Sequence, residues 1–239
     1  MKYPRFFLVA AAASLFALQS VRAESYVLTN SQGAMAYEFL TGWTFGTMYP
    51  EIISALNTGA SSPHSMPSYL KFDLSGLIAD GVEATDITSA TLRLYLTDVV
   101  ASGFGVNPSE AYPVSVNFNL VTEHDWNKST LTYGNAPDAG ALVGSVTGID
   151  SVGYWVELDL TGVVQDWVSG DAANYGLKLT QPNNVRDNTS TSVFALFSSD
   201  GAASNRPELV INSVPEPSTY LLLGASALLL FVLRKRKTA

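Results

Sequence analysis

The 239-residue sequence has no cysteine, only two histidines and few charged side chains. Without cysteine the chain cannot form a disulfide, a thiolate zinc site, an iron–sulfur cluster or a thiol nucleophile. The histidines, His64 and His124, are too few for a multi-histidine metal centre. Charged residues make up 14% of the chain and hydrophobic residues 47%. A charged fraction well below the usual value of about 25% indicates that part of the apolar surplus faces lipid.

Patterns of catalytic residues are also lacking. Neither histidine lies near a Gly-x-Ser-x-Gly turn, and the chain has no phosphate-binding loop and no dinucleotide fingerprint. We therefore predict no catalytic residues and a non-enzymatic protein. The enzymatic alternative is a polysaccharide lyase or hydrolase that uses loop carboxylates together with Tyr112 or Tyr133.

The first 23 residues have the pattern of a secretory signal peptide. Lys2 and Arg5 give a positive start, residues 6–18 are apolar, and the small residue Ala23 ends the segment. Cleavage between Ala23 and Glu24 makes Glu24 the new N-terminus.

The last 26 residues, 214–239, form a second export segment. Its apolar stretch, 217–233, spans roughly 25 Å as a helix, and long basic side chains at its end can reach the lipid headgroups. These basic residues are Arg234, Lys235, Arg236 and Lys237. They place this end in the cytoplasm and the rest of the chain outside. We predict a transmembrane helix over 217–233 and a basic tail over 234–237, which first anchor the chain in the cytoplasmic membrane.

The box Val214-Pro215-Glu216-Pro217, the apolar segment and the basic end together resemble the PEP-CTERM sorting signal. The resemblance implies a Gram-negative bacterium that makes exopolysaccharide. It also implies an exosortase, a transpeptidase-like membrane enzyme, as the processing partner. The expected destination is the cell surface or the extracellular matrix.

Between the two export segments the chain is strongly acidic. Residues 24–214 contain 20 acids and 6 bases, which gives 6 − 20 = −14. A domain with this charge repels nucleic acids and anionic polymers at long range. We therefore exclude nucleic acid as a partner.

Residues 24–213 are expected to form one all-β domain, an antiparallel β-sandwich of jelly-roll type with one short helix. Alternation of apolar and polar residues predicts strands over 69–74, 90–97, 114–120, 154–160, 177–180, 193–198 and 208–212. The early region, 24–65, is less regular, and we expect one or two strands there, near 26–29 and 36–40. The regions 102–113 and 183–192 are expected to be long loops.

The short helix is predicted from Val163, Val164, Trp167 and Val168, which recur at helical spacing. Thr161 or Asp159 is the expected N-cap, and Gly170 follows the end. The string Leu-Asp-Leu-Thr-Gly before this helix repeats an earlier one, Phe-Asp-Leu-Ser-Gly at 72–76. We expect the aspartates to satisfy backbone donors where a helix or turn begins, rather than to bind a ligand.

Several runs in this order resemble the DNRLRE domain, over about 69–212. They are YLKFDLSGL, ITSATLRLYL, HDWNKSTLTYGNAP, WVELDLTGVVQDWVSGDAANYGLKL and SSDGAASNRPELVI. The family consists of extracellular β-sandwich modules and has been grouped with carbohydrate-binding modules. Thr132-Tyr133 stands where the family usually has Thr-Trp. Some relatives are associated with alginate, a polyanion that the charge of this chain disfavours.

Exposed aromatic rings are the usual platform for sugars, and four aromatics lie in or beside expected loops. The candidate ligand-binding residues are Trp43, Tyr112, Trp126 and Tyr133. For Trp126, Trp155 and Trp167, core packing is the favoured interpretation. We expect no cofactor, with one structural Ca²⁺ as a hypothesis, because oxygen ligands are abundant. The sequence thus leaves two functions open, polysaccharide binding and a purely structural role in the matrix.

Overall fold

The computed structural model describes residues 23–48, 52–57, 65–102, 114–149, 151–182, 192–199 and 202–214. The described residues leave out residues 1–22 of the predicted signal peptide, most of the two predicted long loops with Tyr112, and the segment from Pro215 onward. Arg234, Lys235, Arg236 and Lys237 belong to that last segment. Within the described ranges, none of the helices has the length and apolar character that a membrane span requires.

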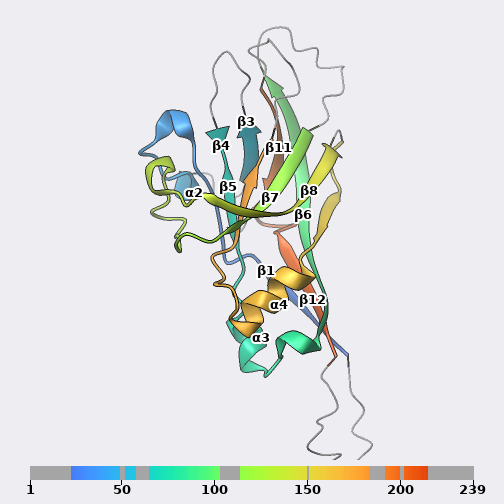
Figure 1. Cartoon of the computed structure of the whole chain (residues 1–239). Coiled ribbons are helices and arrows are strands. Elements are labelled where there is room, and N and C mark those ends of the chain that lie inside the picture. The colour runs from blue at the N-terminus through green and yellow to red at the C-terminus, as the bar shows by residue number, and fades with distance from the viewer. Residues whose placement is uncertain are drawn as a thin grey trace, which may run out of the picture.

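The described strands form two antiparallel sheets, as the alternation predicts (Figure 1). The larger sheet has the order β1 (Glu24–Thr29), β12 (Glu208–Ser213), β6 (Ile87–Ser102), β11 (Ser192–Ser198), β3 (Ile52–Asn57) and β4 (Ser65–Met66), with β9 (Trp155–Asp159) also paired to β6. The smaller sheet has the order β2 (Gln32–Met35), β5 (Ser68–Lys71), β10 (Leu177–Thr180), β7 (Val114–Val121) and β8 (Ala139–Ile149). The chain is thus mostly β, and this architecture is consistent with a β-sandwich.

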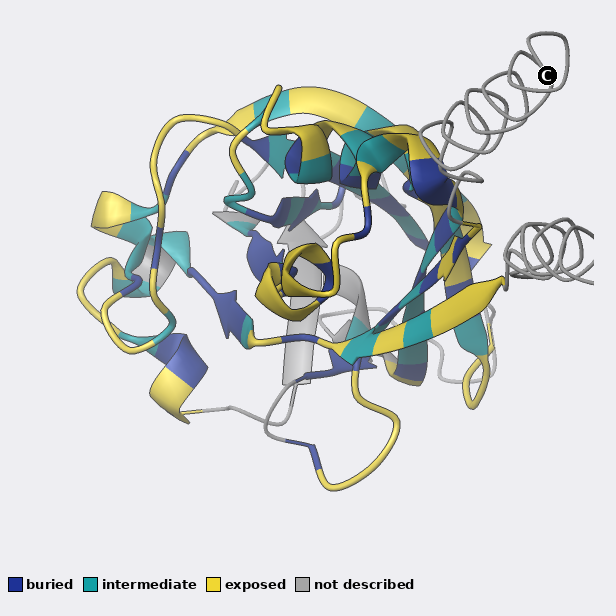
Figure 2. Ribbon diagram, turned by 90° about the horizontal axis from the view of Figure 1, so that it is seen from below, coloured by how far each residue is buried: buried dark blue, intermediate teal, exposed yellow. Residues whose placement is uncertain are grey.

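The core lies between the two sheets, where the apolar sides of the strands meet. On β6, Leu92, Leu94 and Leu96 are buried, and β7 contributes Val116 and Phe118 to the same cluster. Figure 2 shows that buried residues, in dark blue, lie on strands around the middle of the sandwich, whereas exposed residues, in yellow, lie mainly around the outside. This core fixes the two sheets relative to each other.

The outer face of the larger sheet carries a charged group centred on Arg93. The guanidinium bonds to Glu157 at 3.1 Å on β9 and to Glu208 at 2.7 Å on β12. It also lies 4.5 Å from the centroid of the Trp155 ring, which is only partly buried. Arg93 therefore ties three neighbouring strands together.

The described helices differ in number from the prediction. The predicted helix is present as α4 (Thr161–Ser169), which buries Val164 and Trp167 and ends at Gly170 with φ 84°. The expectation of one short helix is nevertheless wrong, because α2 (Phe45–Met48) and α3 (Ser75–Ala79) are present as well. Three 3-10 turns accompany them: η1 (Glu38–Leu40), η2 (Ala84–Asp86) and η3 (Tyr133–Asn135). The strand expected over 36–40 is wrong too, since η1 occupies most of it.

The two similar strings lie at the starts of α3 and α4. Asp73 accepts a hydrogen bond from the Ser75 N–H at 2.9 Å, and Asp159 accepts one from the Thr161 N–H at 2.9 Å. The pKa of Asp73 is lowered, chiefly by this backbone bond, and that of Asp159 chiefly by its bond from the Thr161 hydroxyl. The interpretation of both aspartates as partners of backbone donors is confirmed. The N-cap prediction is corrected, because Leu160 occupies that position.

Candidate functional site

A polar hollow of about 470 Å³ lies beside the connection between β7 and β8. Two segments form it, the start of β2 and the connection over 122–138. The residues that line it are Gln32, His124, Asp125, Trp126, Asn127, Thr130, Leu131 and Asn135. We call this the Trp126 hollow. Its volume lies within the usual range of ligand sites, about 300–1,000 Å³.

The rim of the Trp126 hollow is held by hydrogen bonds within the connection. The Asn127 side chain accepts a bond from the Ser129 N–H at 2.9 Å. The Asn135 side chain accepts from the Thr132 N–H at 2.7 Å and donates to the Thr130 carbonyl at 2.9 Å. Because these bonds exist before any ligand arrives, the rim loses little conformational freedom on binding.

The floor of the hollow belongs to the core. Trp126 is only 6% exposed, and its indole N–H donates to the Tyr175 carbonyl at 2.7 Å. Its ring lies 5.6 Å from that of Tyr69, whose hydroxyl donates to the Pro137 carbonyl at 2.8 Å. The expected core packing of Trp126 is present, as it is for Trp167, while one side of Trp126 still lines the hollow.

A second hollow of about 480 Å³ adjoins the first. Gln32 lines both, and its strand partner Lys71 on β5 lines the second. The Lys71 ammonium bonds to Asp125, a residue of the first hollow, at 2.5 Å. Burial by itself raises the pKa of Asp125, but the bonds from Lys71 and from the Trp126 N–H outweigh it and lower the pKa. The Lys71–Asp125 ion pair therefore lies at the junction of the two hollows, where each of the two charges faces the opposite one.

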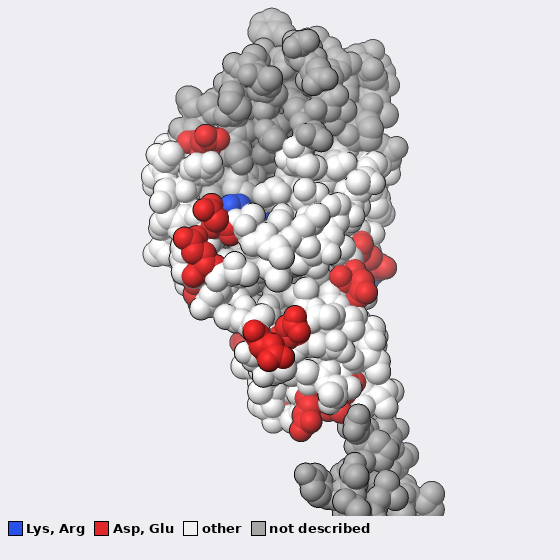
Figure 3. Space-filling view, viewed as in Figure 1, with Lys and Arg blue, Asp and Glu red and all other residues white. Residues whose placement is uncertain are grey.

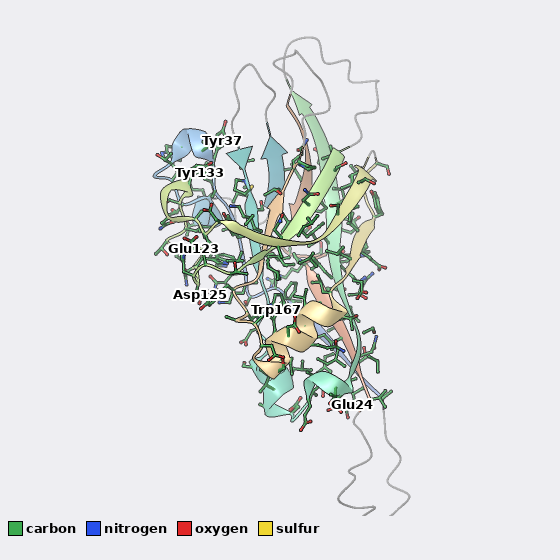
Figure 4. All side chains as sticks on the ribbon, viewed as in Figure 1. Glu24, Tyr37, Glu123, Asp125, Tyr133 and Trp167 are labelled. Atoms are coloured by element: carbon green, nitrogen blue, oxygen red, sulfur yellow. The ribbon has the colours of Figure 1, made fainter. Side chains whose placement is uncertain are left out.

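The remaining candidate aromatics lie close to the same side of the molecule. Trp43 is 48% exposed, and its ring lies 6.4 Å from that of Phe45. Tyr133 is half-buried and begins η3, which contacts η1. Figure 4 shows Tyr37, Tyr133 and Asp125 along one side of the molecule. The structure thus brings Trp43 and Tyr133 to the flank that carries the Trp126 hollow.

Charge on this flank is mostly negative. Burial lowers the pKa of Lys178, although Asp138 and Glu123 act against that change. The Lys178 ammonium donates to the Pro137 carbonyl at 3.0 Å and lies 5.5 Å from the centroid of the Tyr69 ring. Figure 3 shows acidic side chains along the left-hand edge with only a small basic patch among them. An anionic ligand therefore meets repulsion here.

The hollow contains two titratable side chains, Asp125 and His124. A glycosidase acid needs a raised pKa, whereas the pKa of Asp125 is lowered. The His124 ring nitrogen Nε2 lies 3.3 Å from the Asn135 carbonyl oxygen, and Nδ1 lies 3.7 Å from the Glu123 carboxylate. In the part of the chain that the structure describes, no group of three or more His, Asp or Glu side chains is placed to hold a metal ion. The calcium hypothesis therefore has no ligand cluster there.

Comparison with known families identifies the fold. Residues 51–213, more than half of the chain, match the model of carbohydrate-binding module family 96. The chain belongs to this family. Residues 213–237 match the PEP-CTERM protein-sorting motif, which indicates an exported protein sorted by way of the membrane. A search among curated proteins found no match. The family match supports the grouping with carbohydrate-binding modules, while the DNRLRE name stays a resemblance.

Sequence reasoning named only part of this site. Trp126 and Tyr133 belong to the run that carried the resemblance, and Asn127 and Asn135 lie in the same run without having been singled out. Gln32 and Lys71 gave no local signal, because they are distant in sequence and meet only through the pairing of β2 with β5. Tyr112 lies outside the described residues.

Proposed function

We propose that this chain is an exported, non-enzymatic protein of the cell surface or extracellular matrix that binds a neutral polysaccharide in the Trp126 hollow. The observation that carries the proposal is a hollow on a carbohydrate-binding module that is lined by amide, imidazole and hydroxyl groups together with the carboxylate of Asp125. Sugar hydroxyls bind such groups, and each amide can make more hydrogen bonds than the internal ones described above.

The flanking aromatics give the ligand an apolar contact. Trp43 presents nearly half of its surface to solvent. The turn that begins with Tyr133 is linked to the segment before Trp43, because the Gly134 N–H donates to the Thr41 carbonyl at 3.5 Å. A flat aromatic face packs well against the C–H groups of a pyranose ring. The polymer then extends from the Trp126 hollow toward Trp43. This contact involves no charge, which suits a neutral chain.

Export and sorting supply the setting for this activity. The signal peptide delivers the chain across the cytoplasmic membrane, and the segment 217–233 with the tail 234–237 retains it there. An exosortase-type enzyme then processes the chain at the box Val214-Pro215-Glu216-Pro217. The processed domain remains at the surface or in the exopolysaccharide, where its ligand is abundant. The match to the sorting motif supports this sequence of events.

Affinity electrophoresis tests the binding. The full chain in mild detergent is run through gels that contain neutral or acidic polysaccharides, including the exopolysaccharide of the producing cell. We expect retardation in a neutral gel, and a decrease in affinity of at least about threefold for Trp43→Ala and for His124→Ala. Tyr154→Ala is the matched control, because Tyr154 is 38% exposed and precedes β9 on the other sheet. Unchanged mobility in every gel leaves the purely structural role.

The non-enzymatic part of the proposal has a separate test. The full chain is incubated with each polysaccharide that retards it, and the products are analysed for new reducing ends and unsaturated sugars. We expect neither. Either product above the level of a heat-denatured sample establishes a hydrolase or lyase instead.

A further inference from the structure

The sorting motif begins inside the folded domain. Its match starts at Ser213, which is the last residue of β12. The next residue, Val214, donates its backbone N–H to the Asp86 carbonyl at 2.8 Å. The box Val214-Pro215-Glu216-Pro217 therefore follows the last residue of β12 directly, with no spacer between them.

The end of β12 is held from both sides. Ser213 pairs with Glu24 of β1 and with Ile87 of β6, and it is completely buried. The preceding residue, Asn212, pairs with Ser25 of β1 and bonds through its side chain to Ser89. The chain that enters the box is thus fixed by backbone ladders on both edges of the strand.

Extended peptides are commonly bound as an added strand through main-chain hydrogen bonds, which requires backbone groups that are free of other partners. We expect the processing enzyme to hold the stretch before the cut in this way. The residues immediately before Pro215 are Ile211, Asn212, Ser213 and Val214. All of these residues are engaged in the sheet or bonded to Asp86. In the closed sandwich, an enzyme at the box meets a substrate whose upstream part is already paired.

We propose that the end of β12 must separate from β1 and β6 before the box is processed, so that the fold of the sandwich gates the sorting step. This inference rests on the proposed exosortase processing. Strand ends open locally far more often than a domain unfolds, which makes such a gate workable. Processing then proceeds at a rate set by opening of the strand end.

A disulfide across β1 and β12 tests the gate. Ser25 and Asn212 are strand partners with exposed side chains, and the chain has no other cysteine to compete. The variant Ser25→Cys/Asn212→Cys is produced as the full chain, and oxidised membranes are incubated with and without dithiothreitol. The ratio of processed to unprocessed chain is read by immunoblot. Asn212→Cys alone is the matched control.

We expect the oxidised double variant to be processed at least about tenfold more slowly than the control, with recovery on reduction. Equal rates for the oxidised double variant and the control overturn the gate. If the wild-type chain itself is never processed, the proposed exosortase step fails and the gate fails with it, which is a different result.

A second variant keeps every paired residue. A flexible Gly-Ser spacer of about six residues between Ser213 and Val214 leaves both β12 and the box intact, adds up to roughly 20 Å and moves the box away from the sheet. We expect faster processing than in the wild type, and normal processing of the oxidised double variant when it carries the spacer. A spacer that changes neither rate contradicts the proposal.

Discussion

Replacing Gly176 tests how strongly the stability of the domain and the shape of the Trp126 hollow depend on the backbone at this position. It has φ +86°, and a Cβ added there would lie 2.2 Å from the Leu70 carbonyl oxygen, a backbone atom of β5. The left-handed conformation costs an alanine about 1–2 kcal/mol, and relief of the clash by moving a strand adds about 1–3 kcal/mol. We therefore expect Gly176→Ala to lower the free energy of unfolding by about 3 kcal/mol.

The same change reaches the Trp126 hollow. Tyr175, the preceding residue, supplies the carbonyl that accepts the bond from the Trp126 indole. A shift of this backbone moves the floor of the hollow, so we expect the proposed polysaccharide binding to weaken along with stability. For a domain of this size, about 3 kcal/mol corresponds to a fall in Tm of roughly 6–12 °C.

Thermal and urea unfolding, followed by tryptophan fluorescence, measure the effect. Gly162→Ala is the matched control, because Gly162 lies in α4 and an added Cβ meets nothing within 4 Å. Alanine there is expected to be neutral or to stabilise the helix by up to about 1 kcal/mol. A Gly176→Ala variant that unfolds within about 1 kcal/mol of the wild type refutes the reasoning.

Three further predictions concern single contacts. Because the pKa values of Asp73 and Asp159 are lowered in the folded protein, the two carboxylates stabilise the fold above their unfolded pKa of about 3.9, and this stabilisation is lost as the pH falls through their folded pKa values. The urea midpoint of the wild type should therefore fall between pH 5 and pH 3, and that of Asp73→Asn/Asp159→Asn should fall less steeply. Arg93→Met leaves the carboxylates of Glu157 and Glu208 without their cation and should lower the free energy of unfolding in urea by about 1–2 kcal/mol, while Arg93→Lys should have an intermediate stability. Equal stability of both variants and the wild type contradicts this prediction. Tyr69→Phe leaves the buried Pro137 carbonyl with one donor fewer and should cost about 1 kcal/mol, measured in the same way; no loss would show that the bond is neutral.

Most strands could be predicted because one side of each faces the core. The alternation over 114–120 appears in the structure as β7, in which Val114, Val116 and Phe118 are buried. By contrast, β8 gave no signal, since its residues are small and mostly exposed, and its place is set by pairing with β7. The apolar residues within 36–40 suggested a strand, but the 3-10 helix η1 forms there. The prediction failed because local apolar content does not distinguish a turn packed on the core from a strand.

The site was predictable only in part, for a related reason. Trp126 and Tyr133 stood out as aromatics in a loop-like run, and the local bonds of Asn127 and Asn135 explain why that run is ordered. The Lys71–Asp125 pair joins residues 54 apart, so no spacing rule could reveal it. Contacts between residues that are distant in sequence, such as this ion pair and the pairing of β2 with β5, cannot be predicted from a single sequence.

The place of β12 within its sheet also determines how the molecule responds to a pull. A tether attached after Val214 draws the strand along its own axis, between β1 and β6. Cross-strand hydrogen bonds run perpendicular to antiparallel strands, so this load is shared by both ladders at once instead of breaking bonds one after another. A strand at the sheet edge would have only one ladder to resist the same force. A pull at Val214 is therefore resisted along two ladders, one to β1 and one to β6.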